Sequence, residues 1–229
     1  MKPTVILIGI VIFAIAAAIL MPAHYVEEHE TITQVLWNDH EAVVFSGVRR
    51  DGWSGTYAGL AVEMLRGFFG AIPRYDRNMQ WVVVGHITPT GVRTHIQHAT
   101  PFFHVQPFEG ALFRVGDPSL KWDGDGFVPV TAAEQDRLQG RTRASTPDYS
   151  NVEGWSSKMN LLNNEQLRSE TSLNLGGVQV LVIADRSADR IRKTVTVQFG
   201  DGKNVEIVKL NEAPRLVSAN EYESLMKAQ

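Results

Sequence analysis

The segment Gln80–His98, QWVVVGHITPTGVRTHIQH, is the clearest structural signal in the chain. Two runs that contain β-branched and aromatic residues, Trp81–Ile87 and Val92–His98, flank the turn-forming residues Thr88–Gly91. This arrangement is typical of an antiparallel β-hairpin. A hairpin of this kind in the middle of the chain favours a fold built mainly from antiparallel strands.

Strand-like segments also occur on both sides of this hairpin. Thr31–Trp37 and Ala42–Val48 predict two strands joined by Asn38–Glu41, whose side chains favour a turn. Thr194–Phe199 and Asn204–Leu210 predict a second hairpin. Three further segments have a similar composition: Phe102–Val115, Trp122–Val130 and Val178–Ile183. We therefore expect an α+β, mainly β fold in which antiparallel hairpins form a sandwich or a small barrel.

Two or three short helices are expected beside the strands. Apolar residues over Gly59–Ile72 recur at helical spacing, and Pro73 ends the pattern. We expect this helix to pack on a sheet, and the alternative is a helix that lies in the membrane interface or against a partner. Thr131–Glu134 and Ser218–Glu221 have the spacing of helix caps and predict two more helices. The apolar stripe of the first helix comprises Ala61, Met64, Leu65, Phe68, Phe69 and Ile72.

The N-terminal run Thr4–Met21, TVILIGIVIFAIAAAILM, contains no charge, amide or histidine. As a helix it would be about 27 Å long, close to the roughly 30 Å hydrocarbon core of a bilayer. We expect residues 4–23 to form one transmembrane anchor. The alternative is a signal peptide cleaved near Ala18, but the apolar run continues past that site, which favours retention. Small residues that would let this helix pack closely against other helices are Gly9, Ala14, Ala16, Ala17 and Ala18.

Charges on either side of the anchor predict its orientation. Lys2 precedes the run, whereas Glu27, Glu28 and Glu30 follow it, and the next cation is Arg49. Because positively charged flanks stay in the cytoplasm, we expect the N-terminus there and the remaining chain on the extracytoplasmic side, which is the periplasm in a bacterium. The expected partners are membrane lipid and other integral membrane subunits.

Composition along the chain predicts five parts. They are a cytoplasmic N-terminus at 1–3, the anchor at 4–23, a β-rich domain at 24–139, a polar excursion or linker at 140–175, and a C-terminal hairpin region with a terminal helix at 176–229. Within them, Tyr25–Thr31 is expected to be a short acidic stalk. Asn163–Glu170 is compatible with a brief helix. A long polar excursion in a compact domain is usually functional or disordered.

The composition excludes several classes of site. The chain has no cysteine among its 229 residues, which excludes disulfides, thiolate zinc sites, iron–sulfur clusters and cysteine nucleophiles. The formal net charge is −3 and both signs are interspersed, so no basic surface for nucleic acid is expected. Walker, Gly-x-Gly-x-x-Gly and His-Glu-x-x-His motifs are absent, and no cofactor is expected.

Four of the seven histidines lie close together in sequence, at His86, His95, His98 and His104. A divalent metal needs three or four converging ligands. A turn at Thr88–Gly91 pairs His86 with Arg93, so that His86 and His95 share one sheet face with a cation beside them. We therefore expect structural histidines, and His86 and His95 are only weak candidates for metal ligands.

Two further motifs resemble parts of known sites. Asp123–Gly126 matches the opening of an EF-hand calcium loop, but Phe127 and Val128 occupy positions that need a polar ligand and a glycine, so a turn is expected. Ser54 follows Gly-Trp and precedes Gly, as in a serine nucleophile loop. Thr56 stands where that loop needs its second glycine, and no catalysis is expected.

These observations lead to three hypotheses about function. The first is a single-pass, membrane-anchored accessory subunit without catalysis, which packs on and stabilises a larger membrane protein complex, for example an energy-transducing one. The alternative is a membrane-tethered ligand-binding or sensing module. The third is an extracytoplasmic, metal-assisted enzyme that would use His86 and His95.

Overall fold

The computed structural model describes most of the chain after residue 16. The described residues are 17–69, 74–98, 104–108, 111–115, 119–123, 127–142, 154–159, 161–163 and 165–227. The chain divides into two compact units. Unit 1 comprises residues 1–28, 50–79 and 213–229, and unit 2 comprises residues 29–49 and 80–212.

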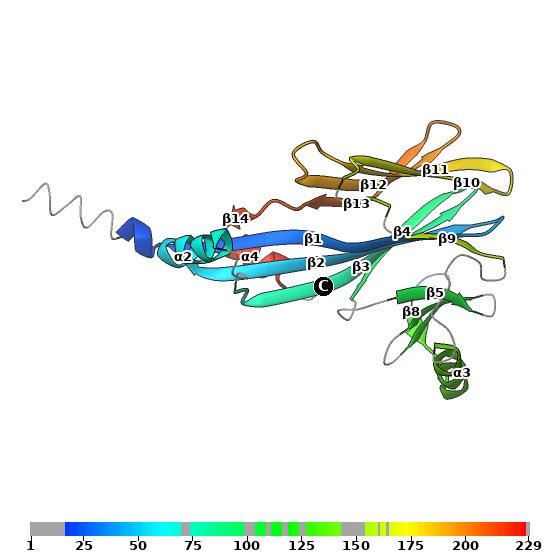
Figure 1. Ribbon diagram of the computed structural model, residues 1–229, viewed down its shortest axis with the longest axis horizontal. Coiled ribbons are helices and arrows are strands. Elements are labelled where there is room, and N and C mark those ends of the chain that lie inside the picture. The colour runs from blue at the N-terminus through cyan, green and yellow to red at the C-terminus, as the bar shows by residue number, and fades with distance from the viewer. Residues whose placement is uncertain are drawn as a thin grey trace, which may run out of the picture. The chain divides into compact units, whose positions relative to one another are not determined.

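Antiparallel strands dominate the structure (Figure 1). The largest sheet contains β1 (Pro22–Trp37), β2 (Ala42–Thr56), β3 (Arg77–Thr88), β4 (Gly91–His98), β9 (Ser156–Met159) and β14 (Arg215–Val217). Its strand order is β14–β1–β2–β3–β4, and β9 also pairs with β1. The mainly β fold with antiparallel sheets and few short helices is therefore confirmed.

Unit 2 contains two further four-stranded sheets. One consists of β10 (Arg168–Leu175), β11 (Val178–Arg186), β12 (Arg192–Phe199) and β13 (Asn204–Asn211). The other consists of β5 (His104–Phe108), β6 (Ala111–Val115), β7 (Leu120–Trp122) and β8 (Phe127–Pro129). In both sheets each strand pairs antiparallel with the next one in sequence, as expected for connected hairpins.

The central strands of unit 2 are buried on both faces, which explains their continuous apolar runs. Because side chains alternate along a strand, Val44 packs in a cluster with the β10–β13 sheet, whereas Val43 and Phe45 pack with β6, β7 and β8. Trp122 and Phe127 contact the Phe45 ring, with ring centroids 6.2 and 5.6 Å away. Unit 2 is thus a layered β structure with one apolar cluster on each side of its central strands.

The hairpin β3–β4 has the register predicted from its turn. His86 pairs with Arg93 and Thr88 with Gly91. Gly85 lies against the Ile207 side chain of β13, because a Cβ atom at this position would be 2.5 Å from Ile207 Cδ1. The glycine in the otherwise apolar run of β3 therefore makes room for a side chain of the neighbouring sheet.

Three helices are described, α2 (Tyr57–Phe68), α3 (Ala132–Thr142) and α4 (Ala219–Leu225). The capping box that begins α3 is formed, since the Glu134 N–H donates to Thr131 Oγ1 at 3.3 Å and the Thr131 N–H donates to Glu134 Oε2 at 2.9 Å. Ser218 caps α4 in the predicted way. The amphipathic helix begins at Tyr57, two residues earlier than predicted, and the Gly59 N–H donates to Thr56 Oγ1.

Unit 1 has two small apolar clusters. In one, Trp53 and Leu60 pack with Ala23, and in the other Val26 packs with Tyr222 and Met226 of the C-terminal segment. Strand β14 pairs with the start of β1. The first and the last described segments of the chain therefore build unit 1 together.

Three expectations about local structure are wrong. Tyr25–Thr31 is part of strand β1 and not an acidic stalk. The residues described within Asn163–Glu170 form no helix, and β10 begins there at Arg168. Part of the expected polar excursion at 140–175 is strand, because β9 and most of β10 lie inside it.

Among the residues described, no helix is both long enough and apolar enough to cross a bilayer. Residues 4–16 of the predicted anchor, with Gly9, Ala14 and Ala16, lie outside the described part. Ala17 and Ala18 are exposed, and the described residues 17–20 are helical. Strand β1 then begins at Pro22, so the last two residues of the expected anchor belong to the sheet.

Candidate functional site

Helix α2 leaves most of its apolar side chains exposed. Among the α2 residues whose side chains are described, every exposed one is apolar or aromatic. Phe68 is 83% exposed, and Phe69, which follows the helix, is 80% exposed. The expectation that this stripe packs on a sheet is therefore wrong, and Leu60 is the α2 residue that is buried.

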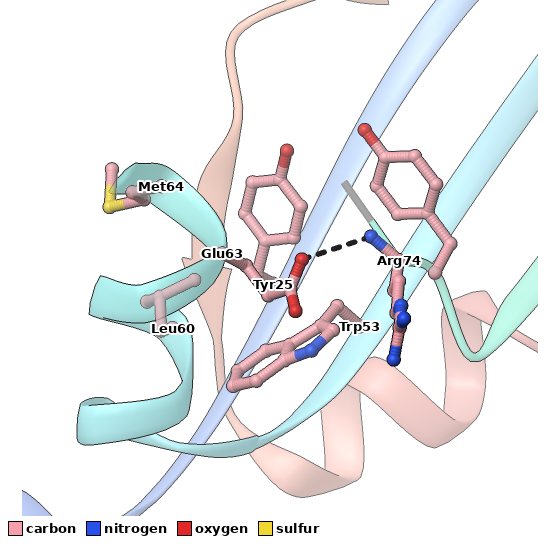
Figure 2. A pocket seen from close by; sticks show the side chains of 7 residues that line it. Tyr25, Trp53, Leu60, Glu63, Met64 and Arg74 are labelled. Atoms are coloured by element: carbon pink, nitrogen blue, oxygen red, sulfur yellow. Dashed lines mark hydrogen bonds between the residues drawn. The ribbon is translucent and has the colours of Figure 1, made fainter. Parts of the chain in front are cut away.

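The charged side chains of α2 lie on its other side. Glu63 and Arg66 form an ion pair with 3.2 Å between Oε1 and Nη1. Glu63 also accepts a hydrogen bond from the Arg74 N–H at 3.1 Å, as Figure 2 shows. The two charged side chains of α2 are thus paired with each other, with Glu63 16% and Arg66 36% exposed.

The apolar surface of α2 continues into the end of the N-terminal apolar run. Ile19, Leu20 and Met21 are exposed, and the Tyr57 N–H donates a hydrogen bond to the Met21 carbonyl oxygen at 3.2 Å. This bond holds the start of α2 beside the residue at which the apolar run ends. The apolar face, as we call this surface, comprises Ile19, Leu20, Met21, Tyr57, Val62, Met64, Leu65, Phe68 and Phe69.

A pocket lies between α2 and the strands of unit 1 (Figure 2). It has an empty volume of about 360 Å³ and is partly open to solvent. The rings of Tyr25 and Tyr75 are stacked, with centroids 6.3 Å apart and an angle of 8° between planes. The lining residues are Tyr25, Trp53, Leu60, Glu63, Met64, Arg74 and Tyr75. An apolar or aromatic group is the kind of ligand that such walls fit.

The two tyrosines of the pocket share one carboxylate. The hydroxyl groups of Tyr25 and Tyr75 both donate to Glu27. Burial raises the pKa of Tyr25 and of Tyr75 above the usual 10.0, and the Glu27 carboxylate raises both further. Both hydroxyls therefore remain protonated donors at neutral pH.

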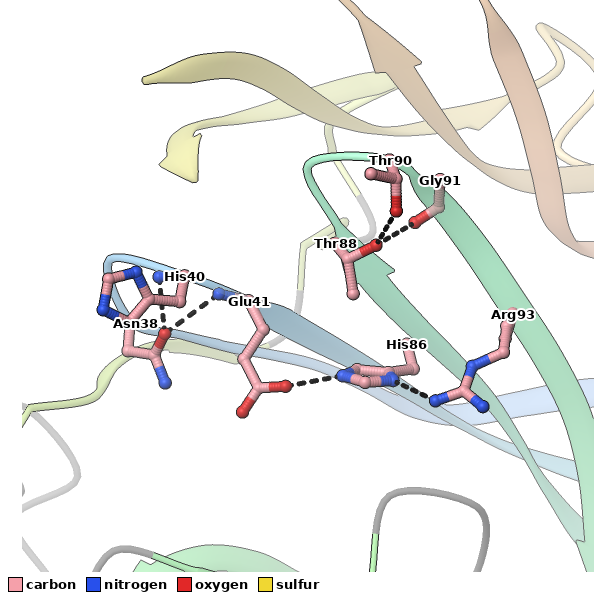
Figure 3. Close-up of polar contacts among 8 residues, drawn as sticks. All are labelled: Asn38, His40, Glu41, His86, Thr88, Thr90, Gly91 and Arg93. Carbon is pink, nitrogen blue, oxygen red and sulfur yellow. Dashed lines mark hydrogen bonds and ion pairs between the residues drawn. The ribbon is translucent and has the colours of Figure 1, made fainter. Parts of the chain in front are cut away.

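His86 and His95 lie on one face of β3–β4, as the register predicts, and both rings contact Trp122. His86 Nε2 is 2.6 Å from Glu41 Oε2, and His86 Nδ1 is 3.4 Å from Arg93 Nη2 (Figure 3). Because a guanidinium can only donate, Nδ1 accepts and Nε2 carries the proton given to Glu41. Both nitrogens of His86 are thus engaged by side chains, Nε2 by Glu41 and Nδ1 by Arg93. The backbones of His98 and His104 pair with Trp81 and Val115, respectively.

Ser54 has a histidine beside it that the sequence did not indicate. Ser54 Oγ is 2.9 Å from His24 Nδ1, and the Ser54 N–H donates to Asp76 Oδ2. In a catalytic triad the acid orients the histidine, and backbone N–H groups near the nucleophile bind the oxyanion. Here Asp76 binds the serine backbone instead of the His24 ring. The contact therefore joins β1 to β2 without the geometry of a nucleophile site.

Two other segments connect neighbouring strands. Trp122 pairs with Phe127, so Asp123–Gly126 connects adjacent strands, although residues 124–126 lie outside the described part. Gly200–Lys203 connects β12 to β13, with the Lys203 N–H donating to Asp201 Oδ1 at 2.9 Å.

Comparison of the chain with protein-family models, with curated protein sequences and with solved structures finds no significant match.

Proposed function

We propose that this protein is a single-pass, membrane-anchored accessory subunit without catalysis, which packs on and stabilises a larger membrane protein complex. One observation supports this role above others: strand β1 begins at Pro22, directly after the apolar run Thr4–Met21. The expected stalk is absent from the described residues, because Tyr25–Thr31 lies within β1. The proposal places the folded units on the extracytoplasmic side, from the charges that flank the run.

A direct connection to the anchor suits a subunit that holds a fixed place in an assembly. A flexible linker would let the folded part sample many positions, whereas a strand that begins at the end of the anchor restricts them. Further contacts hold this strand in unit 1. Arg50 donates to Glu28 of β1 at 2.9 Å and to the Leu225 carbonyl oxygen of α4 at 2.9 Å. The start of β1 is thereby tied to β2 and to the C-terminal helix.

The first experiment is purification of the tagged full-length protein from its native membrane in a mild detergent. We expect other integral membrane subunits to accompany it in fixed stoichiometry. A lone, monodisperse monomer would contradict the proposal. A second experiment inserts a flexible Gly-Ser linker between Met21 and Pro22 and, as the matched control, the same linker at the exposed turn after Ala188. The first insertion should lower the yield of the complex and the control should not.

The pocket of unit 1 supports a second candidate, a membrane-tethered ligand-binding module. Its walls are mainly aromatic and apolar, with Glu63 and Arg74 as polar groups at its edge. Quenching of tryptophan fluorescence by small aromatic compounds would test it, because Trp53 lines the pocket. Quenching that saturates and is lost in Trp53→Phe would favour this candidate over the accessory subunit.

A further inference from the structure

We infer that the apolar face lies in the interfacial region of a lipid bilayer, so that unit 1 makes a second membrane contact besides the anchor. The inference deepens the proposed function and rests on its membrane attachment. The contact is made by α2 and Ile19–Met21, which are described in unit 1 and expose apolar side chains.

The orientation of α2 is the first argument. A surface helix in water turns its apolar stripe toward the core and its charges outward. In α2 the exposed positions are apolar or aromatic, whereas Glu63 and Arg66 are partly buried and paired with each other. Removing large apolar side chains from water is favourable in proportion to the apolar area that is covered. An environment that removes several of them from water therefore stabilises the protein considerably.

The position of α2 decides between lipid and another protein. The Tyr57 N–H is bonded to the Met21 carbonyl oxygen, so the helix begins where an apolar run of transmembrane length ends. A surface continuous with the end of a membrane-spanning segment meets the headgroup and upper acyl region first. Interfacial helices place Phe and Leu side chains in this region, and tyrosine is enriched there. Phe68, Leu65 and Tyr57 of α2 match these preferences.

The absence of cysteine from the sequence gives a direct test. A single cysteine is introduced as Phe68→Cys in the full-length protein and carries a nitroxide spin label. Ala188→Cys, at an exposed turn of unit 2, is the matched control. Both proteins are reconstituted in vesicles of phosphatidylcholine and phosphatidylglycerol. The label's collisions with oxygen, which concentrates in lipid, are compared with those with a water-soluble nickel chelate.

We expect the label at residue 68 to collide more with oxygen than with the nickel chelate, and the label at residue 188 to show the reverse. Equal nickel accessibility at both positions would overturn the inference, because residue 68 would then be in water. A label at residue 68 shielded from both reagents would also overturn it, because protein and not lipid would cover the face.

The result of the spin-label experiment can be distinguished from the result of the purification that tests the proposed function. The spin-label experiment uses lipid and this chain alone, so it does not depend on a partner complex. A lipid-exposed label with no accompanying subunits would retain the membrane contact and remove the accessory role. If the label is in water but the protein still purifies with a complex, the accessory role is retained and the membrane contact of the apolar face is removed.

Discussion

The two units of this protein differ in how far they bury their apolar side chains. In unit 2, strands such as the Val82–Val84 segment of β3 are buried on both faces between two other sheets. In unit 1, the clusters around Trp53 and Val26 are small, and much apolar surface stays exposed on α2. Unit 2 is thus stabilised by its own core, whereas in unit 1 the described chain leaves much of the apolar surface of α2 uncovered.

The same truncation in each unit gives the largest contrast. Phe45→Ala in unit 2 should lower the free energy of unfolding by about 3–5 kcal/mol, because the fully buried ring contacts Trp122 and Phe127. Phe68→Ala in unit 1 should lower it by clearly less, since Phe68 is 83% exposed and buries little surface against the rest of the chain. Denaturant unfolding in detergent, followed by tryptophan fluorescence, measures both. Equal losses would remove the distinction between the units.

The next largest loss of stability is expected when a buried ion pair in unit 2 is broken. The Lys193 ammonium contacts the Glu30 carboxylate, and their side chains are 5% and 2% exposed. Glu30 also accepts a hydrogen bond from Ser46 Oγ at 3.0 Å. Glu30→Gln should cost about 3 kcal/mol, because it leaves a buried ammonium without its partner.

Two controls identify the cause of that loss. Glu206→Gln breaks an exposed pair with Lys209 and should cost less than about 1 kcal/mol. Adding Lys193→Met to Glu30→Gln should restore part of the stability, because the unpaired charge is removed. If the double variant is as unstable as Glu30→Gln, the loss has another origin.

Gly85 tests how tightly the layers of unit 2 pack. Gly85→Ala should lower the free energy of unfolding by about 1–3 kcal/mol, because the new Cβ would be 2.5 Å from Ile207 Cδ1. Combining it with Ile207→Val removes that Cδ1 atom and should recover much of the loss. Thermal unfolding of the two variants measures the effect, and a stable Gly85→Ala single variant would contradict this close approach.

The smallest effect is expected in the pH dependence of unit 1. The pKa of Tyr75 is raised above 10.0 by burial and by Glu27, so its stabilising contribution is complete below pH 10.0 and is lost as the pH rises further. Tyr75→Phe should therefore make stability fall less steeply in this alkaline range. Unfolding curves at a series of alkaline pH values measure the slope, and identical slopes would show that this hydroxyl does not resist ionisation.

The sequence predicted most of what depends on local signals. Turn residues at Thr88–Gly91 predicted the register of β3–β4, and the spacing of Thr131 and Glu134 predicted the cap of α3. It did not predict β1 over Tyr25–Thr31, because acidic residues are depleted in strands and Glu27 and Glu28 find partners only in the folded unit.

The candidate site could not be predicted from local sequence patterns. An amphipathic stripe predicts that one helix face is buried, but not whether protein or lipid covers it. The prediction that the apolar stripe of α2 packs on a sheet was therefore wrong, because its described residues are exposed. The pocket brings together Tyr25, Trp53 and Tyr75 from separate segments, and no sequence spacing connects them.

The division of unit 1 among three segments has a consequence for biosynthesis. Its first segment leaves the ribosome early, but its last segment, residues 213–229, is translated after all of unit 2. Val26 can pack against Tyr222 and Met226 only after they have been synthesised, and β1 can pair with β14 only then. Since chains fold progressively during synthesis, unit 2 can mature while its neighbour is still incomplete. A nascent chain that stalls before residue 213 would therefore present an open strand edge to chaperones and proteases.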